Sequence, residues 1–318
     1  GLMIEAHALT KHFDSFVAVQ NITFTVQPGE VLALLGPNGA GKTTTVRMLT
    51  SLLRPTSGWA RVAGYDIVEE PDQVRASVGV LTENHGLYLR MRGYEYLDFF
   101  GELYGLDPVT RSRRARALAA RFGLEEALNR RLGEYSKGMR QKLSLVRAML
   151  HNPRVLLLDE PTSAMDPQST RLVRDMIKHL RGQERTIVLC THNLAEAEEL
   201  ADRIAIIRRG QIIAQGTPLE LKARLLGPPL LEIRLARTIE ALPDTIADLV
   251  ELDSYGHNWL RYRTPDPMTT NPQVLRRLAE HGAAVVTLSE VPQSLEQVYL
   301  RVIGSEHDVP APSQTLTA

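Results

Sequence analysis

The chain has 318 residues with 37 basic and 37 acidic side chains, so its formal net charge is zero, and hydrophobic residues make up 43%. These values are typical of a globular protein and exclude a disordered tail, a collagen and a disulfide scaffold. The zero balance argues against bulk binding of a polyanion, so nucleic acid is not an expected partner. The single cysteine, Cys190, allows no internal disulfide and fits a reducing compartment.

The hydrophobic pattern predicts an α/β protein. Short alternating strands are expected over residues 3–27 and a buried strand over 30–35, and a helical pattern covers 86–130. Strands expected at 155–158, 186–190 and 204–208 then alternate with helices expected at 167–180 and 194–201. Such alternation favours a mostly parallel sheet with helices on its faces. The longest aliphatic runs are far shorter than the ~20 residues that span a bilayer.

A change of pattern near residue 221 predicts a second, smaller domain. The main domain is placed at 3–220, and a linker is expected at 221–229, where Leu226-Gly227-Pro228-Pro229 interrupts the pattern. Alternating residues 231–235, a helix start at Asn271-Pro272 and a strand over 284–288 predict an α/β accessory domain at 230–303. Residues 304–318 are polar and contain proline, so a disordered tail is expected there.

A glycine-rich loop follows the strand at 30–35. The segment GPNGAGKT matches the phosphate-binding pattern G-x-x-x-x-G-K-[ST] and precedes a predicted helix. Glycines let backbone N–H groups approach a triphosphate, and the helix start adds positive potential. Lys42 is expected to reach the β- and γ-phosphates and the Thr43 hydroxyl to ligate Mg²⁺. The candidate ATP-binding residues are Gly36, Pro37, Asn38, Gly39, Ala40, Gly41, Lys42, Thr43 and Thr44.

Two acids end the apolar strand at 155–158. A strand that reads Val-Leu-Leu-Leu is typical of a sheet buried on both faces, and ligands bind at the carboxyl ends of such strands. Asp159 is therefore a candidate Mg²⁺ ligand, directly or through water. Glu160 is the candidate catalytic residue that polarises the attacking water. A solvated acidic pair is the alternative interpretation.

Three further segments carry a family resemblance. They are Tyr135-Ser136-Lys137-Gly138-Met139, Ser163-Ala164-Met165-Asp166 and Cys190-Thr191-His192. Together with the phosphate loop, they resemble in order the nucleotide-binding subunit of an ABC transporter over residues 3–220. The resemblance implies a P-loop ABC cassette with a mixed sheet, an antiparallel β subdomain and a helical signature subdomain. The small C-terminal α/β domain is similar to the extension of bacterial ABC-2-type exporter ATPases.

The resemblance also implies roles for individual residues. Ser136 and Gly138 correspond to the signature loop that binds the γ-phosphate of ATP held by a second subunit, either an identical copy or a paralogous ATPase. Asp166 belongs to the D-loop, and it also suits a helix N-cap before proline. His192 corresponds to the switch histidine, a catalytic residue beside the γ-phosphate.

Two positions are less direct matches to the family. Glu83 stands near the place of the family's glutamine, where an acid could still ligate Mg²⁺ but could not donate an amide hydrogen bond. Phe13 is the first candidate for stacking on adenine and Phe16 the second, and either ring could instead belong to the core.

A partner subunit is implied by the same resemblance. Six of the chain's 17 aromatic residues lie within residues 88–104, near the place where the family docks its integral membrane permease, at 83–104 here. The alternative is that these rings form the core of the helical subdomain. The basic run at 111–116 suggests either a lipid contact or, more simply, a solvated helix face.

The resulting functional expectation is a cytoplasmic ATPase that is peripheral on the inner face of the membrane. It would work as a head-to-tail dimer around two ATP molecules and drive export of a drug, lipid or other small molecule. The alternatives are a non-transport ABC ATPase acting on nucleic acid or ribosomes, and a regulatory ATP-binding module with little hydrolysis.

Overall fold

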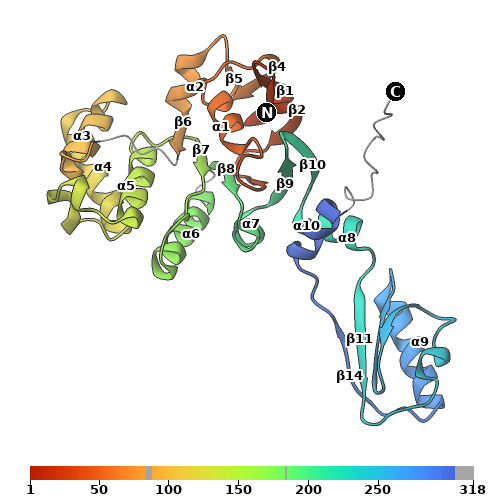
Figure 1. Cartoon of the computed structure of the whole chain (residues 1–318). Coiled ribbons are helices and arrows are strands. Elements are labelled where there is room, and N and C mark those ends of the chain that lie inside the picture. The colour runs from red at the N-terminus through yellow and green to blue at the C-terminus, as the bar shows by residue number, and fades with distance from the viewer. Residues whose placement is uncertain (83–87, 183–184, 305–318) are drawn as a thin grey trace, which may run out of the picture. The chain divides into compact units, whose positions relative to one another are not determined.

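The computed structural model describes residues 1–82, 88–182 and 185–304. The chain divides after Pro218 into two compact units. Figure 1 follows the chain from the N-terminal strands to the C-terminal helix. Within the described ranges, no helix is both long enough and apolar enough to cross a membrane.

A four-stranded antiparallel sheet begins the first unit. Its strands are β1 (Ile4–Phe13), β2 (Phe16–Val26), β4 (Ser57–Val62) and β5 (Tyr65–Asp66), in the order β2-β1-β4-β5. Alternate residues of β1 and β2 are buried in one apolar cluster, as the period of a half-buried strand requires. This sheet is the antiparallel β subdomain that the sequence predicts.

The second sheet has six strands and carries the site. They are β3 (Val31–Leu35), β6 (Val78–Leu81), β7 (Val155–Asp159), β8 (Thr186–Thr191), β9 (Arg203–Arg208) and β10 (Gln211–Gly216), in the order β10-β9-β3-β8-β7-β6. The strands from β9 to β6 are parallel, and only β10 is antiparallel to its neighbour. The predicted mixed sheet is confirmed.

Apolar clusters cover both faces of this sheet. Leu156 and Leu158 of β7 pack with residues from α5 (Lys137–Met149) and α6 (Pro167–Gly182). Val155 and Leu157 of the same strand pack on the other face with α1 (Lys42–Leu49) and α2 (Pro71–Ser77). A continuous apolar strand is stable here because helices bury both of its faces. α7 (Leu194–Leu200) follows β8.

A helical segment connects β6 to β7. It consists of α3 (Gly93–Leu103), α4 (Pro108–Arg121), the 3₁₀ turns η1 (Glu126–Asn129) and η2 (Leu132–Glu134), and α5. Asp107 caps α4 by accepting a hydrogen bond from the Thr110 N–H, and a proline fills the first helical position. This segment is the predicted helical signature subdomain.

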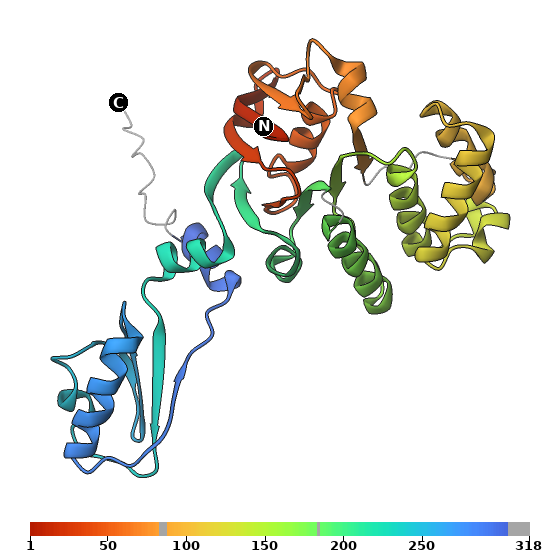
Figure 2. The same ribbon diagram turned by 180° about the vertical axis from the view of Figure 1, so that it is seen from behind.

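The second unit contains a smaller sheet. It comprises α8 (Pro218–Leu226), β11 (Leu230–Leu235), η3 (Leu242–Thr245), β12 (Glu251–Tyr255), β13 (Trp259–Arg263), α9 (Pro267–Glu280), β14 (Val285–Glu290) and α10 (Leu295–Gly304). The antiparallel strand order is β12-β13-β11-β14. Figure 2 shows α9 along one face of this sheet, where Val274 and Leu278 pack with Ile233, Leu260 and Tyr262.

Two local expectations differ from the structure. Much of the segment expected as a linker, 221–229, is helical, because α8 runs to Leu226 and buries Leu221. Helix α9 begins at Pro267 rather than at Asn271-Pro272, because the Asp266 carboxylate caps it and proline fits its first position. Pro272 therefore lies inside the helix, at the loss of one backbone hydrogen bond.

Candidate functional site

The phosphate-binding pattern forms a loop between β3 and α1. Gly41 has a φ of 106° and precedes the first residue of α1, so a side chain there would be strained. A Cβ at Gly36 would lie 2.2 Å from the carbonyl oxygen of Ile207, so only glycine allows the loop to lie against β9. Ala40 is buried, and its N–H donates to the Pro37 carbonyl at 3.2 Å.

Lys42 and Thr43 direct their polar groups toward β7. The Lys42 ammonium donates to the Gly36 carbonyl at 2.5 Å and to Glu160 Oε1 at 2.9 Å. The Thr43 hydroxyl donates to Asp159 Oδ2 at 2.6 Å. The loop and both acids line a pocket of about 390 Å³, whose walls are Phe16, Ala18, Asn38, Gly39, Gly41, Lys42, Thr43, Thr44, Asp159 and Glu160.

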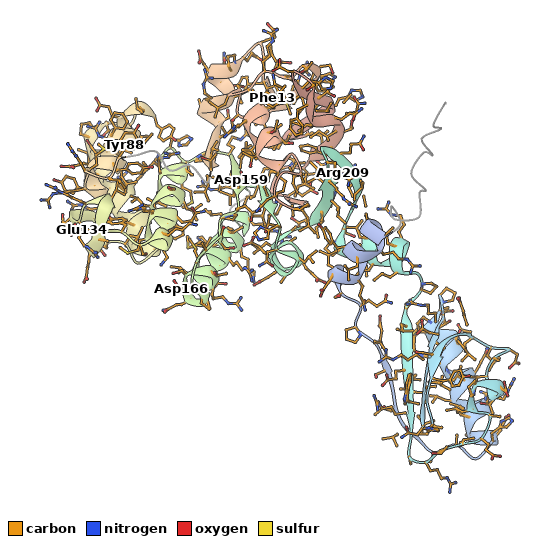
Figure 3. The ribbon with its side chains drawn as sticks, viewed as in Figure 1. Phe13, Tyr88, Glu134, Asp159, Asp166 and Arg209 are labelled. Carbon is orange, nitrogen blue, oxygen red and sulfur yellow. The ribbon has the colours of Figure 1, made fainter. Side chains whose placement is uncertain are left out.

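The two acids of β7 have different environments. Figure 3 labels Asp159 at the end of the strand, where it is 2% exposed. Glu160 follows with a φ of 50°, and its N–H donates to the Cys190 carbonyl at 2.8 Å. The Asp159 carboxylate accepts from the Thr43 hydroxyl, whereas the Glu160 carboxylate contacts Lys42 and His192, so the two acids serve different contacts. Burial raises the pKa of the Cys190 thiol well above its ordinary value, and this cysteine belongs to the apolar core.

His192, the residue directly after β8, lies beside the same group of residues. Its Nδ1 lies 3.0 Å from Glu160 Oε2, while the imidazole remains half-exposed. Glu160 thus contacts Lys42 with one carboxylate oxygen and His192 with the other. The fold brings together five of the predicted residues, Lys42, Thr43, Asp159, Glu160 and His192, because parallel strands end at one edge of the sheet.

The signature segment forms the start of α5. The Ser136 hydroxyl accepts a hydrogen bond from the Met139 N–H at 3.1 Å and so caps the helix. Within the described part of the chain, the nearest atom to a Cβ at Gly138 would be the Met165 Cγ, at 3.9 Å. Among the described residues, the phosphate-loop pocket has no lining residue from 135–139. Ser136 is exposed and Gly138 is partly exposed, so both remain accessible to another molecule.

Asp166 caps α6 by accepting from the Ser169 N–H at 2.9 Å (Figure 3). Hydrogen bonds from Ser169 lower the pKa of this exposed carboxyl, so it is ionised near neutral pH. Phe16 lines the phosphate-loop pocket, whereas Phe13 is 45% exposed and lies outside the pocket's lining. Glu83, the candidate at the position of the family's glutamine, lies outside the described residues.

Sequence reasoning missed two buried polar residues beside the site. The amide of Gln141 in α5 donates to the carbonyls of Glu160 at 3.1 Å and Pro161 at 3.3 Å. The carboxylate of Glu196 in α7 accepts hydrogen bonds from Thr162, in the turn after β7, and from Thr191, the last residue of β8. Three of these contacts, those of Gln141 and the one between Glu196 and Thr162, join residues that are 19 to 34 positions apart, so helical periodicity gives no signal of them.

The aromatic residues of the helical segment divide between core and surface. Tyr96 is buried, and Phe100 and Tyr104 pack against the core. Tyr88, Tyr94 and Phe99 expose 39–47% of their surface. The core interpretation therefore holds for Tyr96, Phe100 and Tyr104, and docking of a permease stays a prediction for the exposed rings.

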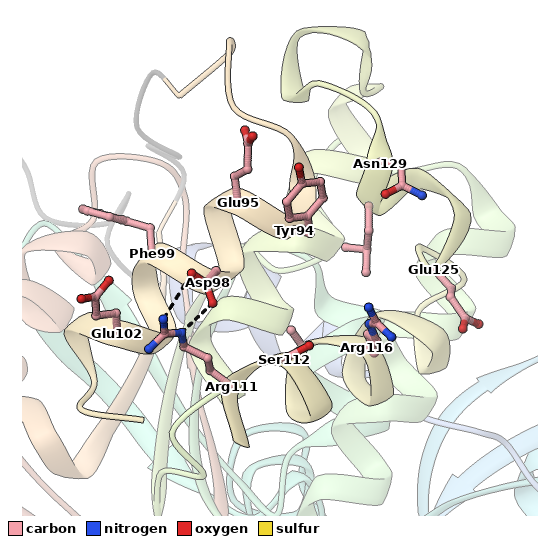
Figure 4. A pocket seen from close by; sticks show the side chains of 12 residues that line it. Tyr94, Glu95, Asp98, Phe99, Glu102, Arg111, Ser112, Arg116, Glu125 and Asn129 are labelled. Atoms are coloured by element: carbon pink, nitrogen blue, oxygen red, sulfur yellow. Dashed lines mark hydrogen bonds and ion pairs between the residues drawn. The ribbon is translucent and has the colours of Figure 1, made fainter. Parts of the chain in front are cut away.

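Tyr94 and Phe99 line a second pocket, of about 780 Å³, between α3, α4 and η1 (Figure 4). On its wall, the Arg111 guanidinium binds Asp98 at 2.5 Å. The lining also includes three further acids, Glu95, Glu102 and Glu125, and one further base, Arg116, so acidic side chains outnumber basic ones in this pocket.

The strand–loop–helix site and the acids of β7 define a P-loop nucleotide-binding ATPase. The family model described as "ABC transporter" matches residues 19–163. The "Daunorubicin/doxorubicin resistance ATP-binding protein DrrA" of Streptomyces peucetius is 38% identical, with 96% of this chain and 93% of that protein covered. The "Nod factor export ATP-binding protein I" of Cupriavidus metallidurans is 34% identical, with 96% and 98% covered.

Solved structures agree with this assignment. "Structure of ATP binding subunit of ABC transporter" has a TM-score of 0.65 and 31% identity, with 70% of this chain and 92% of that chain covered. A dimeric cassette, MJ0796 bound to ADP and Pi, has a TM-score of 0.63 at 22% identity, covers 68% of this chain and 98% of its own, and supports the fold alone. The chain belongs to the ATP-binding proteins of ABC transporters. It binds ATP and is an ATPase.

Proposed function

We propose that this protein is the ATPase subunit of an ABC exporter, and that two copies, or one copy and a paralogue, enclose two ATP molecules. The observation that carries this proposal is the separation of two half-sites. Lys42 and Glu160 line the phosphate pocket, while Ser136 and Gly138 are accessible and are not among its described lining residues. The binding site around a nucleotide held by one copy can therefore be completed only by residues of a second copy.

Phosphate binding is assigned to the loop and Lys42. The loop's backbone N–H groups and the Lys42 ammonium balance the charge of the β- and γ-phosphates. The Thr43 hydroxyl and the Asp159 carboxylate, 2.6 Å apart, offer the hard oxygen ligands that Mg²⁺ prefers. When bound, Mg²⁺ would neutralise phosphate charge. Glu83 is a further proposed ligand, on sequence grounds alone.

Hydrolysis is assigned to Glu160 and His192. The Glu160 carboxylate orients and polarises the attacking water, and the imidazole stabilises charge on the terminal phosphoryl group. Lys42 exchanges its contact with Glu160 for the phosphates, which frees that carboxylate oxygen for water. Loss of the γ-phosphate removes the shared ligand of the two copies, so the dimer opens.

Adenine stacking is proposed for one of two phenylalanines. Phe16 lines the pocket, whereas Phe13 at the end of β1 is close in sequence and exposed. Phe13 has the Lys11 ammonium 5.2 Å from its ring centre, a cation that would also suit a bound nucleotide. Removal of the stacking ring is expected to weaken MgATP binding, and Phe13→Ala and Phe16→Ala measured side by side identify it.

A membrane permease is the proposed partner, and it docks near residues 83–104. The exposed Tyr94 and Phe99 rings offer apolar anchors beside the acidic pocket. The excess of acidic side chains in this pocket favours a partner helix that combines basic and apolar side chains. Membrane association on the cytoplasmic face follows from this docking.

Export is supported by relatives whose names refer to drug resistance and to Nod factor export, over nearly the whole chain. A non-transport ATPase acting on nucleic acid or ribosomes is not favoured by these relatives. The role of the C-terminal unit is proposed to be support of the dimer or of partner binding.

The dimer is tested by Glu160→Gln, which keeps the shape of the side chain but cannot accept a proton. We expect this variant to hydrolyse ATP far more slowly and to accumulate as an ATP-bound dimer in light scattering with MgATP. Adding Gly138→Asp, which places a carboxylate in the second half-site, is expected to restore the monomer. A monomeric Glu160→Gln variant beside a normally active wild type contradicts the proposal.

A further inference from the structure

A buried carboxylate lies beside the site, and the roles proposed above do not use it. Glu196 of α7 is 1% exposed. Its Oε1 accepts a hydrogen bond from the Thr162 hydroxyl at 2.5 Å, and its Oε2 accepts one from the Thr191 hydroxyl at 2.7 Å. Because an unpartnered buried carboxylate is costly, these contacts are needed to hold the group in this place.

The two hydroxyls belong to turns at the ends of neighbouring strands. Thr162 follows Glu160 and Pro161 at the end of β7, while Thr191 ends β8 and directly precedes His192. The strands β7 and β8 pair in parallel, with Asp159 opposite Cys190. The single carboxylate of Glu196 therefore joins the turn after Glu160 to the turn that carries His192.

The backbone around His192 is fixed by a closed set of hydrogen bonds. The Thr191 hydroxyl accepts from the Asn193 N–H at 3.0 Å, and the Asn193 side chain accepts from the Glu196 N–H at 3.0 Å. The His192 imidazole itself is half-exposed and contacts Glu160 at 3.0 Å. Its direction therefore depends on a backbone that Glu196 holds.

The charge of Glu196 is balanced from α6. The Arg174 Nε lies 3.6 Å from Glu196 Oε1, which is beyond hydrogen-bond distance but close enough for attraction. Arg174 also donates to Glu199 at 3.1 Å, on the same helix as Glu196. Glu199 pairs further with Arg171 and Lys178, which are also residues of α6. Glu199 thus shares the helix and the Arg174 contact of Glu196, but not the contacts to the strand ends.

We propose that Glu196 is a positioning residue for ATP hydrolysis. It holds the turns that carry Glu160 and His192 in one relative position, so that both side chains face the same terminal phosphoryl group. The inference rests on the proposed roles of Glu160 and His192. Glu196 is not among the described residues that line the phosphate-loop pocket, so we expect it to act on the chemical step and not on ATP binding.

The test compares three single variants of the full chain. Glu196→Leu removes both acceptors, and misplacement of catalytic groups by about 1 Å is expected to lower kcat about 100-fold. The KM and the Kd for MgATP stay within about twofold, because the phosphate loop is untouched. Glu196→Gln keeps one acceptor oxygen and can donate to the other hydroxyl, so it restores most of kcat. Glu199→Gln, the matched control, keeps the kcat of the wild type.

A mutant cycle separates positioning from general packing. Thr162→Val and Thr191→Val each remove one hydroxyl, and each is expected to lower kcat in the wild type but to have little further effect in Glu196→Leu. Full kcat in Glu196→Leu overturns the proposal. So does an equal loss in Glu199→Gln, or a loss of ATP affinity that matches the loss of kcat. Glu160→Gln is measured alongside, and persistent turnover in that variant contradicts the proposed role of Glu160 instead.

Discussion

The ammonium group of Lys42 lies 2.9 Å from a carboxylate oxygen of Glu160, and both side chains are at least 94% buried. One residue comes from the phosphate loop and the other from the end of β7, far along the chain. Two buried charges of opposite sign are stable here because each satisfies the other. This pair ties the group that binds phosphate to the group proposed to activate water.

Lys42→Ala is expected to abolish tight MgATP binding, because no other side chain of the loop carries a positive charge. It also leaves the Glu160 carboxylate buried without its ammonium, at a cost of about 3 kcal/mol in the free energy of unfolding. Calorimetry with MgATP and denaturant unfolding measure the two effects. Adding Glu160→Gln should recover stability but not binding, and unchanged affinity in Lys42→Ala refutes the assignment.

Gln141→Leu is expected to lower kcat and to cost about 2 kcal/mol of stability. Its amide donates to the carbonyls of Glu160 and Pro161, which would lose a buried donor. The Glu160 backbone, with a φ of 50°, would lose one of the contacts that hold its turn. Turnover assays and urea unfolding provide the readout. Gln73→Leu on the exposed face of α2 is the control, and equal effects of both changes would exclude this explanation.

Gly79→Ala and Gly138→Ala are expected to separate folding from function. A Cβ at Gly79 would lie 2.0 Å from the Ala148 carbonyl, so this change should cost about 3 kcal/mol and lower Tm by roughly 5–10 °C. A Cβ at Gly138 meets nothing closer than 3.9 Å among the residues that the structure describes. Gly138→Ala should therefore keep Tm and reduce ATPase activity through the second copy. Calorimetric scans measure Tm, and turnover assays measure ATPase activity. Full activity in Gly138→Ala argues against a role of Gly138 in the second half-site.

His151 is expected to make stability fall in mild acid. Burial lowers the pKa of this imidazole, which stacks on Tyr104 and lies 2.8 Å from the Val78 carbonyl. Below about pH 6.5 the His151 imidazole is protonated in the unfolded chain but stays neutral in the folded chain. The free energy of unfolding therefore decreases as pH falls.

His151→Gln retains a donor for the Val78 carbonyl but does not titrate. The difference in unfolding free energy between wild type and this variant should therefore shrink or change sign as pH is lowered from 7.5 to 5.5, with a slope of at most about 1.4 kcal/mol per pH unit. Parallel denaturation curves measure it. A difference that is constant with pH would contradict a depressed pKa at His151.

Local sequence determined the parts of the site that lie on one continuous segment. The pattern from Gly36 to Thr43 needs its glycines for close backbone approach and its helix start for charge, so chemistry and local structure are encoded together. The apolar strand before Asp159 likewise indicated burial on both faces of a sheet. The class of fold followed from the alternation of these elements.

Tertiary structure decided which distant residues meet. Gln141 and Glu196 are polar residues in helices, and the packing of those helices brings Gln141 to the carbonyls of Glu160 and Pro161 and brings Glu196 to the Thr162 hydroxyl. The pairing of β7 with β8 brings His192 within reach of Glu160, although 32 positions separate them in the chain. Such contacts depend on strand order and helix packing, which hydrophobic periodicity does not specify. The sequence by itself thus determined the chemistry of each segment, and the fold determined how these segments act together.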